Sequence, residues 1–290
     1  MDNSILAMTR LFSPSVYREL GSSKEPLLLP RLLKQSNLPK LLSPNTELST
    51  AFDWAYDNIR RPGLRPDYVY RNAIIKKVHL GRHSLRTSQA LQEFRIENRK
   101  ADLALLNTRS TAYEIKSDRD NTQRLIDQLE KYAQVFQSTY LVCSPLVADS
   151  IQLKIPSHVG ILQLSTQYTL QTIRKAEPED GLLNSRTISR CMTIPEAVHC
   201  LNQIGVTLPQ VPNTQTRCAI EEAFSQIQPT TAASLLNREL KRTRRQFWTQ
   251  ETLDSLPESL LSRALASTTS ALTVPRVLER LHDPIKALLP

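Results

Sequence analysis

The sequence lacks three features that would assign it at once to a class of protein. No apolar run approaches the roughly 18 to 20 residues that a membrane-spanning helix needs, so we expect no membrane protein. The first residues, MDNSILAMTRLFSPS, contain no basic segment followed by an apolar core, which is not the pattern of a secretory signal. The four cysteines are scattered without a CxxC pair. We therefore expect reduced, mostly buried thiols in a cytoplasmic protein, rather than a disulfide or a zinc site.

Acidic residues are scarce in two stretches of a chain whose formal net charge is +9. Residues 71–100 hold eight Lys or Arg and only two acids, and residues 238–245 hold five bases in eight positions. Clusters of this kind can neutralise the phosphates of a nucleic acid. For the second cluster, a solvated helix face explains the charges equally well.

The residues predicted to contact a nucleic-acid backbone come from these two stretches and from a helix expected at 120–138. They are Lys76, Lys77, Arg82, His83, Arg86, Arg124, Lys241, Arg242, Arg244 and Arg245. DNA is the favoured partner and RNA stays open. A second copy of the chain or another protein partner is also compatible with the sequence.

Three regions follow one another along the chain. Residues 1–66 are rich in Leu, Pro and Ser, and the frequent prolines must keep helices there short, apart from one at 49–61 capped by Ser49. Residues 67–176 mix helix and strand patterns, whereas 177–290 favours helices throughout. The predicted fold class is therefore α/β (α+β), with a mixed sheet as the core at 67–176 and helical regions on both sides.

The central region predicts the order helix, three strands, helix, strand, and one further strand. Alternation of apolar and polar residues identifies the first strand, and apolar residues at helical spacing identify the second helix, which Asp118 or Asp120 would cap. The helices are expected at 67–80 and 120–138, and the strands at 91–98, 101–107, 111–117, 139–144 and 159–165.

A charge pair stands inside the third expected strand. In YEIK, Glu114 and Lys116 are two residues apart. A strand therefore turns both side chains to one face, while their neighbours point into the core. Asp102 begins the preceding strand, and a hairpin through 107–110 could bring it beside Glu114. Two carboxylates and one lysine would then converge.

Two close carboxylates repel each other unless a cation lies between them. Mg²⁺ or Mn²⁺ meets that need because both prefer oxygen ligands, and the backbone carbonyl of Ile115 offers a third oxygen. Lys116 could then orient a water molecule or stabilise charge that develops on a phosphate. Metal-assisted hydrolysis of a phosphodiester uses this set of groups. The spacing alone is a weak indication, since it arises by chance and an exposed Glu–Lys pair on a strand is commonly just solvated.

In its context the pattern resembles the PD-(D/E)XK nuclease superfamily. ADLALL and YEIK supply the D…ExK core, and QLEKY is similar to the Q-x-x-x-Y element of the RecB-like exonuclease branch. Three longer segments, YVYRNAIIKKVHLGRHSL, EFRIENRKADLALLN and YEIKSDRDNTQRLIDQLEKYAQVF, resemble one uncharacterised family of bacterial proteins assigned to this superfamily. The resemblance covers about residues 67–176.

The resemblance implies a role for each matching residue. Asp102 and Glu114 would be metal ligands, Lys116 would be the catalytic lysine, and Gln128 and Tyr132 would line the site from the following helix.

This sequence departs from the superfamily pattern at two points. Many members add an acid from the first helix, but YRNAIIKK contains none. Glu93 is the substitute candidate for a metal ligand, unless it is only a solvated partner of Arg95. Ala101 precedes Asp102 in place of proline. The first departure leaves the number of metal ions open.

The resulting hypothesis is a metal-dependent nuclease that hydrolyses DNA in bacterial defence, such as phage defence, or in repair. The competing hypothesis is a catalytically silent nuclease-fold module that binds DNA or a protein, and a third is a structural subunit of a larger complex. The presence of Asp102, Glu114 and Lys116 favours the enzyme, whereas the missing acid in the first helix favours the binding module.

Overall fold

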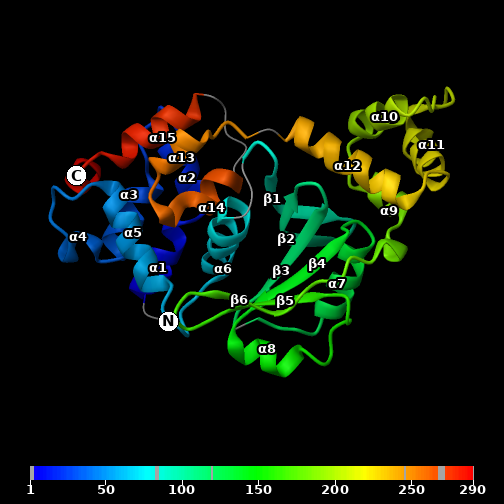
Figure 1. The fold of residues 1–290 in the computed structure, drawn as a ribbon. Helices are drawn as coiled ribbons and strands as arrows, with labels where there is room; N and C mark the ends of the chain where they lie inside the picture. The colour runs from blue at the N-terminus through cyan, green and yellow to red at the C-terminus, as the bar shows by residue number, and fades with distance from the viewer. Residues whose placement is uncertain (1–2, 82–84, 119, 245, 267–271, 290) are drawn as a thin grey trace. The chain divides into compact units, whose positions relative to one another are not determined.

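The computed structural model describes residues 3–81, 85–118, 120–244, 246–266 and 272–289 (Figure 1). It is a mixed α/β structure in which helices flank a six-stranded mixed sheet, which confirms the predicted fold class. The chain divides into two compact units. Unit 1 comprises residues 1–85, 166–168 and 246–290, and unit 2 comprises 86–165 and 169–245. This division differs from the three consecutive regions expected from the sequence, because both ends of the chain belong to one unit.

The sheet of unit 2 keeps its strands in chain order. Strands β1, β2 and β3 form an antiparallel meander, β3, β4 and β5 run parallel, and β6 returns antiparallel to β5. The strands are β1 Gln89–Ile96, β2 Arg99–Leu106, β3 Ser110–Lys116, β4 Ser138–Cys143, β5 Gly160–Leu164 and β6 Leu170–Arg174. The first five confirm the predicted strands. Strand β6 was not predicted, because it is an edge strand whose residues are all at least partly exposed and it therefore lacks an apolar pattern.

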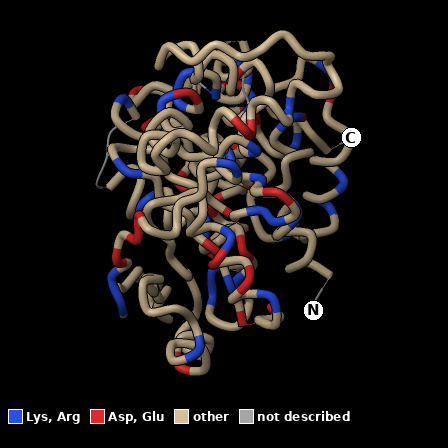
Figure 2. The backbone as a smooth tube through the Cα atoms, turned by 90° about the vertical axis from the view of Figure 1, so that its right-hand side faces the viewer, with Lys and Arg blue, Asp and Glu red and all other residues tan. Residues whose placement is uncertain are grey.

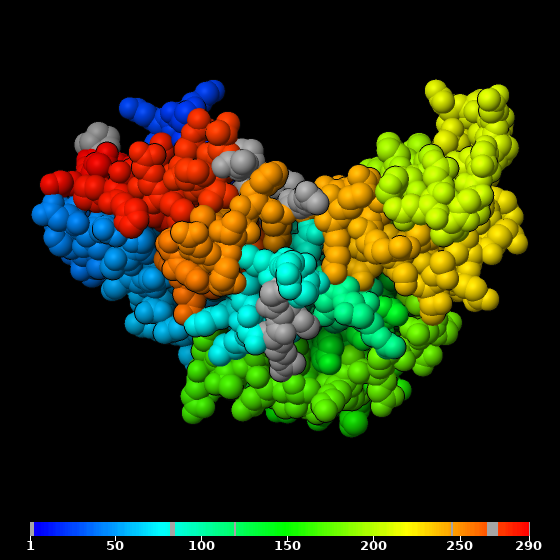
Figure 3. Space-filling view, turned by 45° about the horizontal axis from the view of Figure 1, so that its top comes forward, coloured from blue at the N-terminus to red at the C-terminus, as the bar shows by residue number. Residues whose placement is uncertain are grey.

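Two apolar clusters hold unit 2 together. In one, helices α7 (Leu125–Ala133) and α8 (Pro145–Ile151) pack against β4 and β5. In the other, the end of α7 and strands β1 to β3 meet the remaining helices, which Figure 3 draws in yellow to orange. These helices are α9 Ser185–Arg190, α10 Ile194–Gln203, α11 Asn213–Ser225 and α12 Pro229–Thr243, after a short 3₁₀ turn η2 at Asp180–Leu182. Helix α7 thus covers the face of β3 and β4 on which the site is built.

The expected cap of α7 was wrong. The helix begins at Leu125, and its N-cap residue Arg124 makes no side-chain capping bond. Asp120 instead accepts hydrogen bonds from both the backbone N–H and the hydroxyl of Ser117, each at 2.7 Å. Asp118 accepts a hydrogen bond from Ser144. Both acids therefore close the loop after β3 and do not start the helix.

Unit 1 is built from short helices, as the prolines predicted. They are α1 Asn3–Leu11, α2 Pro14–Leu20, α3 Leu28–Gln35, α4 Leu38–Leu41, α5 Leu48–Ile59, α6 Asp67–Ile74, α13 Gln250–Asp254, α14 Leu261–Ala266 and α15 Thr273–Leu281, with the single turns η3 Glu258–Leu260 and η4 Ile285–Leu288. Helix α5 starts before Ser49 and has Glu47 as its N-cap, so the predicted cap at Ser49 was wrong. Helix α6 continues into a π-helical turn, η1, at Ile75–Leu80. Within the described part of the chain, no helix is both long and apolar enough to cross a membrane.

Candidate active site

Strands β2 and β3 bring Asp102 next to Glu114. Their register sets Leu103 opposite Tyr113, so Asp102 and Glu114 lie one step further along the same pair of strands. The backbone N–H of Ile115 donates a hydrogen bond to Asp102 Oδ2 at 2.8 Å. This bond fixes the orientation of the Asp102 carboxylate, which is half-buried.

Glu114 and Lys116 form an ion pair inside the protein. Lys116 Nζ donates to Glu114 Oε1 at 2.7 Å, and the two side chains are only 11% and 3% exposed. Their neighbours across the parallel strand, Leu141 and Cys143, pack in the apolar cluster beneath α7 and α8. A charged pair in such surroundings is costly to bury unless both partners are present and hydrogen-bonded. The pair is thus held in a fixed geometry.

Tyr132 on α7 completes the environment of Glu114. Its fully buried hydroxyl lies 2.7 Å from Glu114 Oε2 and 2.5 Å from the carbonyl oxygen of Lys100. Burial, and then the charge of Glu114, raise the pKa of Tyr132 far above its ordinary value, while a hydrogen bond with Gln128 acts in the opposite direction. Tyr132 is therefore a neutral phenol that ties α7 to β2 and β3, and Gln128, half-buried, lies beside it. The contribution of Lys100 was not predicted, because it comes from a backbone carbonyl, which every residue type has.

Glu93 lies where the β1–β2 ladder is interrupted. Gln92 pairs with Leu103 and Phe94 with Ala101, while Glu93 and Asp102 between them form no ladder pair. Glu93 has a left-handed backbone, with φ at +52°, which is uncommon for a residue with a side chain. Its carboxylate is about half exposed and lies 3.6 Å from Lys100 Nζ. Across the described residues, no group of three His, Cys, Asp or Glu gathers in a way that could hold a metal, and the role of Glu93 as a metal ligand stays a prediction.

The oxygen atoms at the site suit a magnesium ion whose remaining ligands are not supplied by the protein. Two carboxylates, Asp102 and Glu114, and the carbonyl of Ile115 offer oxygen atoms, which Mg²⁺ and Mn²⁺ prefer. Magnesium is usually held by one or two carboxylates, with water and substrate phosphate as its remaining ligands. The residues present therefore fit one such ion, and they provide no closed cage made of protein alone.

The other predicted nucleic-acid contacts differ in how they are engaged. Lys241 donates to the carbonyls of Thr87 and Asn107, Arg242 pairs with Glu239, and Arg244 pairs with Glu196. Lys76 pairs with Glu258, and Asp127 on α7 pairs with Arg99. Arg86 and Arg124 are exposed, whereas Arg82, His83 and Arg245 lie outside the described residues. Figure 2 shows Lys and Arg residues spread along the backbone and interspersed with Asp and Glu residues.

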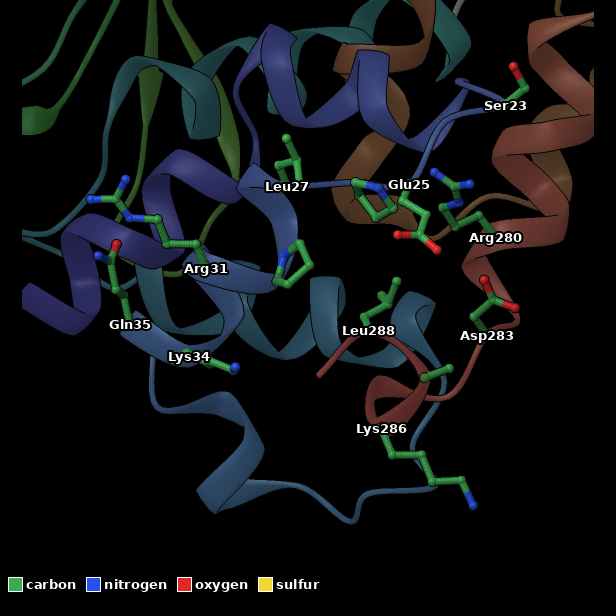
Figure 4. Close-up of a pocket in the computed structure, with 13 residues that line it drawn as sticks. Ser23, Glu25, Leu27, Arg31, Lys34, Gln35, Arg280, Asp283, Lys286 and Leu288 are labelled. Carbon is green, nitrogen blue, oxygen red and sulfur yellow. The ribbon is translucent and has the colours of Figure 1, made fainter. Parts of the chain in front are cut away.

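Unit 1 contains a separate cavity with a volume of about 770 Å³ (Figure 4). Segment 23–35 and residues near the C-terminus line it, and their charges are mixed: four cations (Arg31, Lys34, Arg280, Lys286) face two acids (Glu25, Asp283). Its size lies within the range of small-molecule pockets. None of the strand residues described above lines it, so it is distinct from the carboxylate–lysine site.

Comparison with known proteins gives one family and one relative. The model of a family described as bacteriophage P4 protein cII matches residues 61–263. Protein cII of Enterobacteria phage P4 is 30% identical over 113 residues, which cover 38% of this chain and 42% of that protein. The chain thus matches less than half the length of this relative.

Among solved structures, a protein of unknown function from Silicibacter pomeroyi matches 60% of this chain and 88% of its own, with 12% identity and a TM-score of 0.30. None of these three descriptions states an activity.

Proposed function

Because the chain belongs to the bacteriophage P4 protein cII family, whose name states no chemistry, we propose a function from the site itself: a metal-dependent nuclease that hydrolyses phosphodiester bonds, with DNA as substrate. One observation carries the proposal. On neighbouring strands, Asp102 is oriented by the backbone of Ile115, and Glu114 is paired with Lys116. The meander β1–β2–β3, followed by α7 and a parallel β4, supports the resemblance to the PD-(D/E)XK superfamily.

The metal would be held by Asp102, Glu114 and the Ile115 carbonyl. Bound there, Mg²⁺ or Mn²⁺ would supply an acidified water molecule and neutralise charge on the phosphate. The protein residues contribute orientation and charge. Ile115 N–H and Tyr132 hold the two carboxylates, and Lys116 keeps an ammonium group beside them that can stabilise the negative charge of the reacting phosphate.

Several cations could hold the nucleic acid against the site. Arg86 and Arg124 are exposed members of unit 2 and the first candidates for contacts with backbone phosphates. A role in bacterial defence or in repair, inside the cytoplasm, would suit such an enzyme. The chemistry of the site does not depend on which of these roles applies.

One observation favours the silent binding module as the second candidate. Both carboxylate oxygens of Glu114 already have protein partners, Lys116 and Tyr132. A metal ligand would have to exchange one of them. The same module could still bind DNA through its cations.

The test incubates the purified protein with labelled linear and circular DNA, with Mg²⁺, Mn²⁺ or EDTA, beside Lys116→Ala. We expect cutting that requires the metal and is lost by a factor of about 10²–10³ in the variant, since Lys116 would act on charge in the transition state. Thermal unfolding of both proteins checks that the variant is folded. Circular DNA separates endonuclease from exonuclease action.

Two results would count against the enzyme. Cutting that persists in Lys116→Ala would assign the activity to another site or to a contaminant. Binding of DNA without cutting, under every metal and unaltered in the variant, would favour the binding module. RNA is tested in the same way before the nuclease is abandoned.

A further inference from the structure

The turn between β5 and β6 carries an aromatic residue at a position that disfavours one. Ser165 N donates to the carbonyl of Thr169 at 2.8 Å, and Thr169 N donates to Ser165 Oγ at 3.0 Å. These bonds close a three-residue loop, 166–168, whose last residue, Tyr168, has φ at +62°. Glycine is the usual choice for the left-handed residue of such a loop. The tyrosine is therefore explained by what its side chain contacts.

Tyr168 belongs to unit 1 and is anchored there by hydrogen bonds. Its hydroxyl lies 2.5 Å from that of Tyr56, and the two rings meet edge to face. Asn72 donates to the Tyr56 hydroxyl at 3.1 Å. The ring of Tyr168 is thus fixed in position while part of its surface stays exposed.

Three cations gather around this ring. Lys77 Nζ lies 5.2 Å from the ring centroid, and the guanidinium carbons of Arg60 and Arg65 lie 5.4 and 6.0 Å from it. They come from the end of α5, from the following loop and from η1. We call Arg60, Arg65, Lys77 and Tyr168 the cationic cluster. Cations over an aromatic face are attracted to the ring, but three at such distances repel one another.

Each of the two arginines in the cluster has partners within the protein. Arg60 pairs with Asp57 at 3.0 Å, and the two side chains are 40% and 59% exposed. Arg65 donates to the carbonyls of Arg60 and Thr166 at 2.7 and 2.8 Å, which orients its guanidinium.

Lys77 has no ion pair among the described residues, whereas its neighbour Lys76 pairs with Glu258. The π-helical turn η1 carries both lysines, and such turns occur frequently at functional sites.

We propose that the cationic cluster binds the phosphate backbone of a nucleic acid. Fixed guanidinium groups match phosphate oxygens in geometry, and a lysine adds a mobile charge. Because the cations lie over the ring of Tyr168, that ring serves as their platform and not as a surface on which a base stacks. The identity of the polymer rests on the proposed function, whereas the anion site rests on the cluster alone.

The test measures DNA binding, not cleavage. Lys116→Ala protein in EDTA is titrated against labelled duplex and single-stranded DNA by fluorescence anisotropy over a series of salt concentrations. Adding Lys77→Gln should weaken binding several-fold and reduce the slope of log K against log salt by about 0.9 for duplex or about 0.7 for single strands, the value of one phosphate contact. Lys77→Arg should restore both. Lys40→Gln, an exposed lysine on α4 of the same unit, is the control for net charge.

The outcomes separate this proposal from the nuclease. The proposal is overturned if Lys77→Gln and Lys40→Gln give the same slope of log K against log salt. It is also overturned if the protein binds neither duplex nor single-stranded DNA. Equal loss in Lys77→Arg and Lys77→Gln, with a lowered melting temperature in both, assigns Lys77 a structural role and also overturns it. Because no metal and no cleavage enter the measurement, an inactive protein with the expected slopes still supports the cationic cluster.

Discussion

Tyr132 offers one hydroxyl hydrogen to two acceptors. The Glu114 carboxylate and the Lys100 carbonyl both lie within hydrogen-bond distance of it, and a phenol can donate only once. This atom therefore links α7 to β2 and β3 directly at the proposed metal ligand. Residues that orient a ligand in this way affect metal sites almost as strongly as the ligands themselves.

We expect Tyr132→Phe to lower both stability and activity. Removing the hydroxyl leaves one buried acceptor oxygen without its donor, which costs about 1–3 kcal/mol in the free energy of unfolding. Because the Glu114 carboxylate would lose the hydroxyl that orients it, the rate of cleavage should fall by about 10–100-fold. Urea unfolding and single-turnover cleavage measure the two effects. The control is Tyr140→Phe, which removes the same atom from a partly exposed ring on β4, and equal effects in the two variants would contradict the assigned role.

The cysteines should differ sharply in reactivity. Burial raises the pKa of the Cys143 and Cys200 thiols to about 12, and the same holds for Cys191. Cys218 is exposed. Because the thiolate is the reacting form, we expect a disulfide-exchange reagent at pH 8 to modify Cys218 quickly and the other three only after unfolding. Rapid reaction of a second thiol in the native protein would contradict this burial.

Among elements, α10 and α12 are joined by a buried acid. The Glu239 carboxylate binds Arg242 one turn away and His199 Nδ1 at 2.7 Å on α10. The hydrogen bond from Arg242 lowers the pKa of Glu239 below its ordinary 4.5, against the opposing effect of burial. The folded state thus holds this proton less tightly than the unfolded state. The ionised Glu239 carboxylate therefore stabilises the fold fully above about pH 4.5. This stabilisation is lost as the pH falls through the lower pKa that Glu239 has in the folded state.

Glu239→Gln should therefore flatten the acid limb of the stability curve. We expect a loss of about 1.5–3 kcal/mol at neutral pH, the range for hydrogen bonds to charged groups, and a smaller difference from the native protein in acid. Denaturant unfolding at several pH values measures this, with the exposed Glu251→Gln on α13 as a control. A constant difference at all pH values would contradict the assignment.

Local patterns predicted the elements whose side chains alternate or repeat strongly. The strands β1 to β5 were predicted because one or both of their faces are buried, and Glu114 and Lys116 share a face because a strand repeats every two residues. The cap expected from Asp120 failed because Ser117 offered it a nearer donor. Helix α8, only seven residues long, was also missed. The role of Glu93 stays a prediction.

At the scale of the whole molecule, the chain crosses between its two units more than once. Residues 246–290 belong with 1–85, and bonds such as Arg263 to the carbonyl of Phe12 and Ile285 N–H to the carbonyl of Thr46 join them. Such long-range partners leave no periodic signal in the sequence. For this reason the sequence did not predict the division into units, whereas it did predict the order of helices and strands along residues 67–165, apart from helix α8.

The fragment 86–245 should fold by itself. It contains the complete sheet, helices α7 to α12 and both apolar clusters. We expect mixed α/β circular dichroism and a cooperative thermal transition. The fragment 1–85 provides the contrast, because it lacks the C-terminal partners of its helices and should unfold without a clear transition. A cooperative transition in the fragment 1–85, together with none in the fragment 86–245, would contradict the division into two units.

The most direct test of the central claim, that Asp102 and Lys116 act at one catalytic site, is a double-mutant cycle. Single-turnover DNA cleavage with Mg²⁺ is measured for the native protein, Asp102→Asn, Lys116→Ala and the double variant. We predict a loss of about 10²-fold or more for each single variant and little further loss in the double variant, since residues that act as a unit are not additive. Native cleavage rates in either single variant, or fully multiplicative losses in the double, would contradict the claim.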